Sequence, residues 1–255
     1  MSSAIETTVE RGICTLSMNR PHKKNALTGE MYACITEWIR QADTDPNLRV
    51  IVITGSQGDF TAGNDLNDFL DQPDTGSDSV TAEFLLAIAE TTVPIIAAVE
   101  GLAIGVGTTM LAHCDFVYAD PGAMFSLPFI NLALVPEAGS SQTIVQMAGY
   151  HKAAELLMLG EPFDAETAQS IRLVNKVCAP GEALSDALKT AEQLAAKSRT
   201  ALRHTKALMK RPEEPIGERI YAELKIFSDL LETEAPREVM GAFIEKRKID
   251  RNKID

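Results

Sequence analysis

The chain has 255 residues, of which 45% are hydrophobic and 24% charged, and its formal net charge is −12. This length permits one large domain, or one domain with a smaller appendage, and the composition is that of an ordinary globular protein with a sizeable core. The acidic balance argues against nucleic-acid binding as the main function, because phosphate backbones require basic patches.

The four cysteines and four histidines are scattered along the chain, without a CxxC motif or the spacing of a metal site. We therefore expect buried, reduced cysteines and no metal. The N-terminus lacks a secretory signal pattern, and the most apolar run, residues 93–112, contains Glu100 and three glycines. These features predict a cytoplasmic protein without a membrane span.

The first half of the chain alternates strand and helix patterns. Residues 5–18 alternate around Gly12 as two short strands do, and a polar loop over 19–27 precedes Thr28, the predicted N-cap of a helix over 29–43. The near-continuous apolar runs 50–54 and 94–99 are typical of strands covered on both faces, with a helix over 81–91 between them. Segment 65–78 carries five aspartates, which predicts a solvated, mobile surface loop.

The second half contains shorter elements and then a long helical region. We expect a helix over 105–112, strands over 114–119, 122–127 and 174–177, and short helices over 140–149, 152–159 and 165–170. From residue 183 onward the pattern is helical, with interruptions at Pro212, Pro215 and Pro236. A stripe of apolar residues there either caps the core or packs on another subunit: Ile220, Leu224, Phe227, Leu230 and Leu231. Strand and helix recur at short intervals, so the fold class is α/β with repeated small units.

Two glycine-rich turns, over residues 55–66 and 100–109, follow the predicted strands 50–54 and 94–99. Glycines allow a sharp turn from strand to helix, and such a helix start leaves backbone N–H groups unpaired. Two such groups converging on one point would form an oxyanion hole, although each turn alone is more often a plain bend. The second turn reads G-x-x-x-G-x-G rather than G-x-G-x-x-G, which disfavours a Rossmann-type dehydrogenase.

Glu137 is the one acidic residue between Asp120 and Glu155, in a chain with 36 carboxylates. A carboxylate among apolar neighbours is costly unless it is paired, and burial raises its pKa, which suits a general base. Alternatively, Pro136 opens a helix and Glu137 simply favours the positive end of the helix dipole. If it faces a pocket, Glu137 is the first candidate for the chemistry.

The chain resembles the crotonase superfamily, the enoyl-CoA hydratase/isomerase family, over essentially its whole length. The matching segments occur in order and at suitable spacing: Asn19-Arg20-Pro21 with Asn25-Ala26-Leu27, Ala62-Gly63-Asn64-Asp65-Leu66, residues 95–101 through Gly107, Cys114-Asp115, and residues 238–248.

The resemblance implies a spiral of repeated ββα units with a C-terminal α-helical trimerisation region. Residues 1–195 would form the acyl-CoA-binding catalytic core, and residues 196–255 would serve oligomerisation and closure of the site. The implied assembly is a homotrimer or a hexamer of two trimers. The implied ligand is an acyl-CoA thioester, with no separate cofactor, since coenzyme A is part of the substrate, and with no nucleic acid or membrane as partner.

Carried over by position, the two oxyanion-hole amides are those of Asn64 and Val106. The residues implied to contact the substrate or its CoA moiety are Lys23, Lys24, Ala26, Ala62, Asp65, Leu66 and Phe129. The two lysines would suit the phosphates of CoA, although exposed lysines are more often simply solvated. Residues 67–80 would border the acyl tunnel.

Thr109 and Phe129 stand where hydratases of this family place two glutamates around the water to be added. Neither residue is a base, so hydration is disfavoured. Glu137 stands where the Δ3,Δ2-enoyl-CoA isomerases carry their single acid, which implies a shift of a 3-enoyl-CoA double bond to 2-trans. The alternatives are another crotonase reaction, such as hydration or thioester hydrolysis, and a non-catalytic acyl-CoA-binding protein.

Overall fold

The computed structural model describes residues 4–71, 76 and 78–254. The strands are β1 (Ile5–Glu10), β2 (Ile13–Met18), β3 (Val50–Gly55), β4 (Ile95–Val99), β5 (Leu102–Ile104), β6 (Phe116–Ala119), β7 (Met124–Ser126), β8 (Phe163–Asp164) and β9 (Lys176–Val177). The α-helices are α1 (Gly29–Thr44), α2 (Leu66–Asp71), α3 (Val80–Glu90), α4 (Val106–Thr109), α5 (Ser140–Ala148), α6 (Tyr150–Ala154), α7 (Ala165–Ser170), α8 (Ala183–Ala195), α9 (Arg199–Met209), α10 (Ile216–Leu231) and α11 (Glu234–Glu245). Shorter helical turns are η1 (Pro21–Lys23), η2 (Met110–His113), η3 (Pro128–Leu132), the π-helical η4 (Glu155–Leu159) and η5 (Arg251–Lys253).

Two sheets organise the chain. The larger sheet has the strand order β1-β2-β3-β4-β6-β9, and the smaller one has the order β5-β7-β8. In the larger sheet β1 is antiparallel to β2, whereas β2, β3, β4, β6 and β9 pair in parallel. Parallel neighbours need crossover connections, which the intervening helices and loops supply. The predicted α/β class is confirmed.

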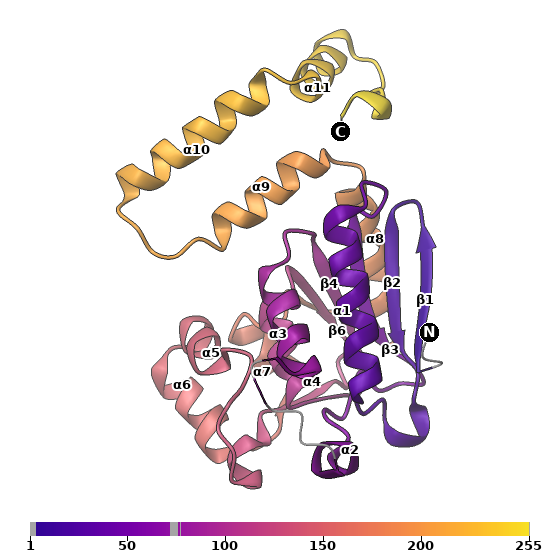
Figure 1. The fold of residues 1–255 in the computed structure, drawn as a ribbon, viewed down its shortest axis with the longest axis vertical. Coiled ribbons are helices and arrows are strands. Elements are labelled where there is room, and N and C mark those ends of the chain that lie inside the picture. Colours follow the sequence, from indigo (N-terminus) through magenta and orange to yellow (C-terminus); the bar gives the residue numbers. More distant parts are fainter. Residues whose placement is uncertain (1–3, 72–75, 77, 255) are drawn as a thin grey trace.

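Strand β3 lies between two hydrophobic cores, because alternate side chains of a strand point to opposite faces of the sheet. Ile51 and Ile53 belong to the core that contains α1 and α3, whereas Val50 and Val52 belong to the core formed with α8 (Figure 1). All four side chains are buried. The near-continuous apolar run of β3 is therefore explained by helices that cover both faces of the sheet.

The N-terminus of α1 is capped in a way that the sequence did not indicate. Thr28 is the N-cap residue, as predicted, but its side chain makes no capping hydrogen bond. The amide of Gly29 instead donates to Oδ2 of Asp68 at 3.1 Å. Asp68 lies in α2, so the predicted loop over 65–78 is wrong in part. Asp65 caps the start of this helix, because its Oδ1 accepts from the amide of Asn67 at 3.1 Å. Residues 72–75 and 77 of that predicted loop lie outside the described residues.

The remaining elements lie close to their predicted ranges, and the differences are local. The predicted helix over 105–112 divides into α4 and η2, and the predicted helix over 152–159 divides into α6 and η4. The short strands β5 and β8 and the turn η3 were not predicted, because two to five residues are too few to show a period.

The C-terminal helices leave the α/β core in sequence. Helix α9 is bound to the core by hydrogen bonds from Arg199 to the carbonyl of Ala42 at 3.1 Å and from Arg203 to that of Asp43 at 2.7 Å. Helices α10 and α11 then extend away from the core, with α9 between them and the sheet (Figure 1). The division of the chain at residue 195 stays a prediction.

Candidate functional site

Backbone pairing brings the two glycine-rich turns together. The amide of Thr61, in the first turn, donates to the carbonyl of Leu102 at 2.8 Å, and the amide of Ile104 donates back to the carbonyl of Thr61 at 3.0 Å. Strand β5, which contains both partners, runs directly into α4. The loop that carries Asn64 is therefore held beside the helix start that carries Val106.

Two glycines make this approach possible. A Cβ atom on Gly63 would lie 2.7 Å from the carbonyl oxygen of Ile104, and a Cβ atom on Gly107 would lie 2.5 Å from Cγ2 of Thr61. Gly63 also has a φ of +88°, which disfavours any larger residue. At both positions a side chain in place of glycine would strike the opposite turn.

The two predicted oxyanion-hole amides are both available for a ligand. Val106 is the first residue of α4, after Gly105 with a φ of +57°, so its N–H has no partner within the helix. Within the described part of the chain neither this N–H nor that of Asn64 donates a hydrogen bond. Both N–H groups are therefore without an acceptor among the described residues, which the predicted oxyanion hole requires.

The side chain of Asn64 is held by Tyr32 of α1, whose hydroxyl donates to Oδ1 of Asn64. Tyr32 is buried, and its ring lies 5.0 Å from that of Phe84. Burial, and secondarily the charge of Glu137, raise the pKa of the Tyr32 phenol well above its usual range. Tyr32 therefore fixes the side chain of Asn64 from a buried position in α1.

Glu137 lies in the loop before α5 and is directed towards α4. Oγ1 of Thr109 donates to Oε1 of Glu137 at 2.5 Å. Burial raises the pKa of the Glu137 carboxyl, and the hydrogen bond from Thr109 opposes part of that rise. Its own carbonyl accepts two bonds from Ser140, from the amide at 2.9 Å and from Oγ at 2.6 Å. Helix α5 begins only at Ser140, after Gly139. The alternative in which Pro136 opens the helix and Glu137 merely decorates its first turn is wrong.

The residues predicted to contact the CoA moiety are brought together at the edge of this site. The amide of Leu27 donates to the carbonyl of Gly63 at 2.8 Å, and the amide of Ala62 donates to that of Lys24 at 2.9 Å. These bonds place the loop with Lys24 and Ala26 beside the segment with Ala62, Asp65 and Leu66, the last of which begins α2. Asp65 pairs with Arg20 at 3.0 Å, and this guanidinium holds the pKa of the Asp65 carboxyl below its usual value.

Of the remaining predicted contacts, Lys23 and Lys24 are exposed and Phe129 is buried. Phe129 lies in η3, and its carbonyl accepts from the amide of Leu134 at 2.9 Å, at the start of the loop that leads to Glu137. The second position where a hydratase would carry an acid thus holds an aromatic ring in the core.

Sequence reasoning missed three contacts in this site: the phenol of Tyr32 on Asn64, the hydroxyl of Thr109 on Glu137, and the imidazole of His113 on the carbonyl of Ala138. Thr109 lies within the predicted helix over 105–112 and His113 directly follows it, but nothing in the sequence indicated which segment their side chains contact.

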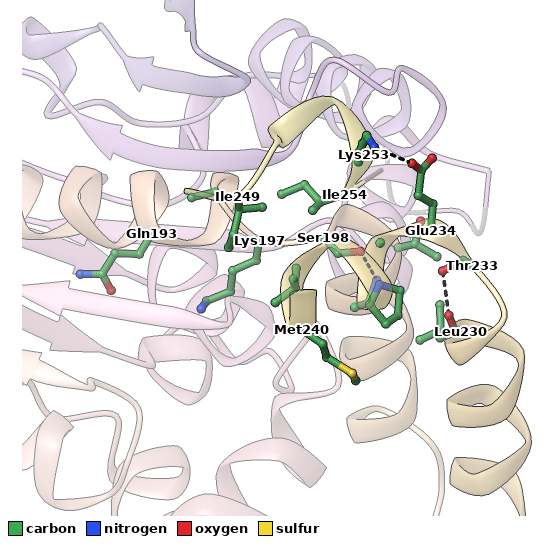
Figure 2. A pocket seen from close by; sticks show the side chains of 16 residues that line it. Gln193, Lys197, Ser198, Leu230, Thr233, Glu234, Met240, Ile249, Lys253 and Ile254 are labelled. Carbon is green, nitrogen blue, oxygen red and sulfur yellow. Dashed lines mark hydrogen bonds and ion pairs between the residues drawn. The ribbon is translucent and has the colours of Figure 1, made fainter. Parts of the chain in front are cut away.

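A separate hollow lies between the end of α8, the start of α9, and the α10–α11 region (Figure 2). Its volume is about 740 Å³, and an ion pair of 3.3 Å between Glu234 and Lys253 lies at its margin. No residue predicted for the oxyanion hole, the acid or the CoA contacts lines it. This cavity is distinct from the site around Glu137.

The described residues contain neither a cluster of metal-ligating side chains nor a helix that could span a membrane. In residues 4–71, 76 and 78–254 no three or more His, Cys, Asp or Glu side chains gather as a metal site would require. Over the same residues no helix has the length and apolar character needed to cross a bilayer.

Comparison with known proteins agrees with the fold. The pattern of the family described as enoyl-CoA hydratase/isomerase matches residues 8–252. A solved structure from Magnetospirillum magneticum AMB-1, named as a candidate enoyl-CoA hydratase/carnithine racemase, has a TM-score of 0.96 and 49% identity, and the match covers 99% of this chain and 100% of that one. The predicted crotonase-like fold is confirmed.

The relatives with curated names include proteins named as hydratases and a protein named as an isomerase. A protein of Mycobacterium tuberculosis named a probable enoyl-CoA hydratase is 35% identical over 240 residues, or 92% of each chain. Enoyl-CoA delta isomerase 2 of Rattus norvegicus is 37% identical over 182 residues, which cover 69% of this chain and 46% of that protein.

Proposed function

Since this chain belongs to the enoyl-CoA hydratase/isomerase family, we propose that it is an isomerase that converts a 3-enoyl-CoA to the 2-trans-enoyl-CoA, with Glu137 as its single general base. One observation carries the proposal: the hydroxyl of Thr109 donates to the half-buried carboxyl of Glu137. The position where the resemblance places a hydratase acid is occupied by a neutral donor. Among the described residues, Glu137 is the only one whose carboxyl group is hydrogen-bonded to α4, and Thr109 is its donor.

The chemistry needs one group that takes up and returns a proton. Glu137 removes the proton from C2, which the adjacent thioester acidifies, and the electron pair of that C–H bond forms a C1–C2 double bond while the carbonyl pair moves onto the thioester oxygen. The protonated Glu137 then delivers the same proton to C4: the oxyanion restores the carbonyl, the C1–C2 pair becomes the C2–C3 double bond, and the C3–C4 pair forms the new C4–H bond. No atom is gained or lost, and one base suffices because C2 and C4 lie close together on one face of the planar intermediate.

The intermediate carries negative charge on the thioester oxygen, and the amides of Asn64 and Val106 would stabilise it. Loss of one such donor typically costs ~3 kcal/mol, or about two orders of magnitude in rate. Burial serves the same reaction twice, because it raises the pKa of Glu137 towards neutrality and strengthens the bonds to the oxyanion.

The loops beside Asn64 would hold the rest of the substrate. Lys23 and Lys24 are exposed and form no ion pair with a described residue, which leaves their charges for the CoA phosphates. Ala26, Ala62, Asp65 and Leu66 would line the path of the CoA chain between these lysines and the oxyanion hole. Phe129 would keep water away from the acyl group.

The C-terminal helices support a proposal about assembly. Large apolar side chains of α10 and α11 are exposed: Ile216, Ile220, Tyr221, Leu224, Phe227, Leu231, Val239, Met240, Phe243 and Ile244. A monomer rarely exposes so many apolar groups on one pair of helices. We propose that these surfaces pack against further copies of the chain in a homotrimer, which either remains alone or pairs into a hexamer.

Hydration is the second candidate, because relatives of this chain are named as hydratases. A hydratase must hold and deprotonate a water molecule, and Thr109 and Phe129 provide no second carboxylate for that task. The two candidates differ by one molecule of water in their product.

The test is therefore incubation of the protein with 3-hexenoyl-CoA and with 2-hexenoyl-CoA, followed by mass analysis of the products. Conversion of 3-hexenoyl-CoA to a product of unchanged mass that co-elutes with 2-hexenoyl-CoA in chromatography supports the proposal, whereas unchanged 3-hexenoyl-CoA, or a hydrate or a free acid from either substrate, contradicts it. Glu137→Gln should abolish the conversion. Glu100→Gln is the matched control, because Glu100 is a second glutamate whose pKa is raised by burial, and it lies outside the site.

A further inference from the structure

The element formed by α4 and η2 carries three polar groups beside the loop of Glu137. The amide of Val106 and the hydroxyl of Thr109 belong to α4, and the imidazole of His113 belongs to the last residue of the 3-10 turn η2 that follows. The first group would bind the oxyanion, and the second contacts the carboxyl of Glu137. The third has no place in the mechanism above.

His113 contacts the residue that follows Glu137. Its Nε2 lies 2.8 Å from the carbonyl oxygen of Ala138. Because a carbonyl oxygen only accepts hydrogen bonds, Nε2 carries the proton and donates it. The imidazole therefore reaches across from η2 to the backbone of the loop that carries the acid.

That loop adopts an unfavourable conformation. Ala138 has a φ of +54° and Gly139 a φ of +66°, so two successive residues are left-handed and one of them carries a side chain. A non-glycine residue in this region is strained and persists only where surrounding contacts hold it. The contacts here are Ser140, which bonds to the carbonyl of Glu137, and His113, which bonds to the carbonyl of Ala138.

The charged groups around His113 favour the neutral ring. Burial lowers the pKa of the imidazole, and Lys210 and Lys206 of α9 lower it further, against an opposing contribution from the bond to Ala138. Both lysines are fixed, Lys206 by Asp115 at 2.7 Å and Lys210 by the carbonyl of Ala89 at 2.8 Å. A neutral ring has one N–H, and the bond to Ala138 uses it.

We propose that His113 is a positioning residue for Glu137: through the carbonyl of Ala138 it holds the left-handed turn that keeps the carboxyl against Thr109 and out of solvent. This inference rests on the proposed role of Glu137 as the base. It assigns to one continuous segment, α4 with η2, the oxyanion donor, the donor to the acid, and the support of the backbone that carries the acid.

The test uses three substitutions that differ in where they place a donor. Gln at position 113 carries its amide nitrogen about as far out as Nε2, Asn carries it at the distance of Nδ1, and Phe retains a flat ring without a donor. We expect His113→Gln to retain kcat within about threefold, and His113→Asn and His113→Phe to lose roughly 10- to 100-fold in kcat with little change in KM, as misplacement of a reacting group by about 1 Å does.

A readout that does not depend on turnover separates this inference from the proposed function. The carboxyl of Glu137 can be titrated by NMR in protein labelled at the glutamate carboxyl carbon, with the signal assigned by its loss in Glu137→Gln. In His113→Asn and His113→Phe the pKa of Glu137 should fall towards its usual range as the turn relaxes into solvent, whereas His113→Gln should keep it raised. Melting temperatures report any general loss of structure.

Each outcome decides the inference. If the signal titrates identically in the Gln and Asn variants, His113 does not position Glu137, whatever the melting temperatures show. If the pKa falls as expected but Glu137→Gln still isomerises the substrate, the positioning stands and the proposed function is wrong. If His113→Phe does not fold, the comparison of Gln with Asn remains sufficient.

Discussion

Replacement of Gly107 by Ala tests whether the close contact between the two turns sets the reaction rate. The new Cβ would lie 2.5 Å from Cγ2 of Thr61, whereas ordinary contacts begin at 3.4 Å, so one of the two groups must move by about 0.9 Å. Thr61 cannot rotate away without loss, because its hydroxyl donates to the carbonyl of Asn25 at 2.7 Å and accepts from the amide of Gly63 at 3.1 Å. The displacement therefore falls on α4 and on the amide of Val106.

The expected loss follows from that displacement. A shift of about 1 Å in a catalytic contact lowers the rate by about 100-fold, and overpacking of this kind costs about 1–3 kcal/mol of stability. The assay is kcat/KM for conversion of 3-hexenoyl-CoA, measured with the free energy of unfolding in urea. Gly122→Ala is the matched control, because a Cβ there meets no atom within 4 Å.

A second substitution makes the reasoning refutable. Thr61→Ser removes the methyl group that the new Cβ would strike and keeps the hydroxyl, so the double variant Gly107→Ala with Thr61→Ser should recover most of the lost activity. If Gly107→Ala alone keeps full activity, or if the double variant recovers stability but no activity, contact between the turns does not govern the oxyanion site.

Three further predictions follow from the same contacts. Thr109→Val removes the donor that holds down the pKa of Glu137, so the acid limb of the kcat/KM profile should move to higher pH. Near neutrality kcat/KM should fall roughly tenfold, because a hydrogen bond to a charged group contributes about 1.5 kcal/mol. An acid limb that does not move would contradict the contact. Because burial raises the pKa of Glu137 in the folded state, its contribution to stability is full below the pKa of the unfolded chain and is lost as the pH rises through the folded value. Glu137→Gln should therefore become more stable than the wild type in urea unfolding as the pH rises, and equal stability at all pH values would refute this. Phe227→Asp, on an exposed apolar face of α10, should shift the protein to monomers in analytical ultracentrifugation, whereas the substitution of exposed Glu223 by Gln should not.

The fold was predictable wherever a periodic pattern of hydrophobic residues or a long apolar run marked a helix or strand. The runs that became β3 and β4 predicted strands buried on both faces, and α1 and α3 occur within two residues of their predicted ranges. Strand β5 was not predicted, because three residues show no period, yet it is the strand that pairs with Thr61. Helix α2 was taken for a loop because aspartates signal solvated turns, whereas Asp65 and Asp68 here cap α2 and α1.

The candidate site was predictable from its glycines and its isolated acid, and less so from its supporting contacts. Gly63, Gly107 and Glu137 are unusual in their local sequence, because close backbone approach and a buried carboxyl each demand a particular residue type. Tyr32, Thr109 and His113 are ordinary residues in helical segments. Their contacts to Asn64, Glu137 and Ala138 join segments that lie 25 to 32 residues apart, and no local rule predicts such pairs.

The distance between Thr109 and Glu137 restricts how this scaffold changes its chemistry over evolutionary time. The two side chains meet at 2.5 Å, so a carboxylate at position 109 would stand against that of Glu137, and two like charges so close do not both ionise. A lineage that acquires an acid at position 109 while it keeps Glu137 would therefore hold two carboxyls that share one proton, with the pKa of one of them strongly raised. On such a scaffold a single substitution at position 109 changes the titration of the acid that is already present, as well as adding a second one.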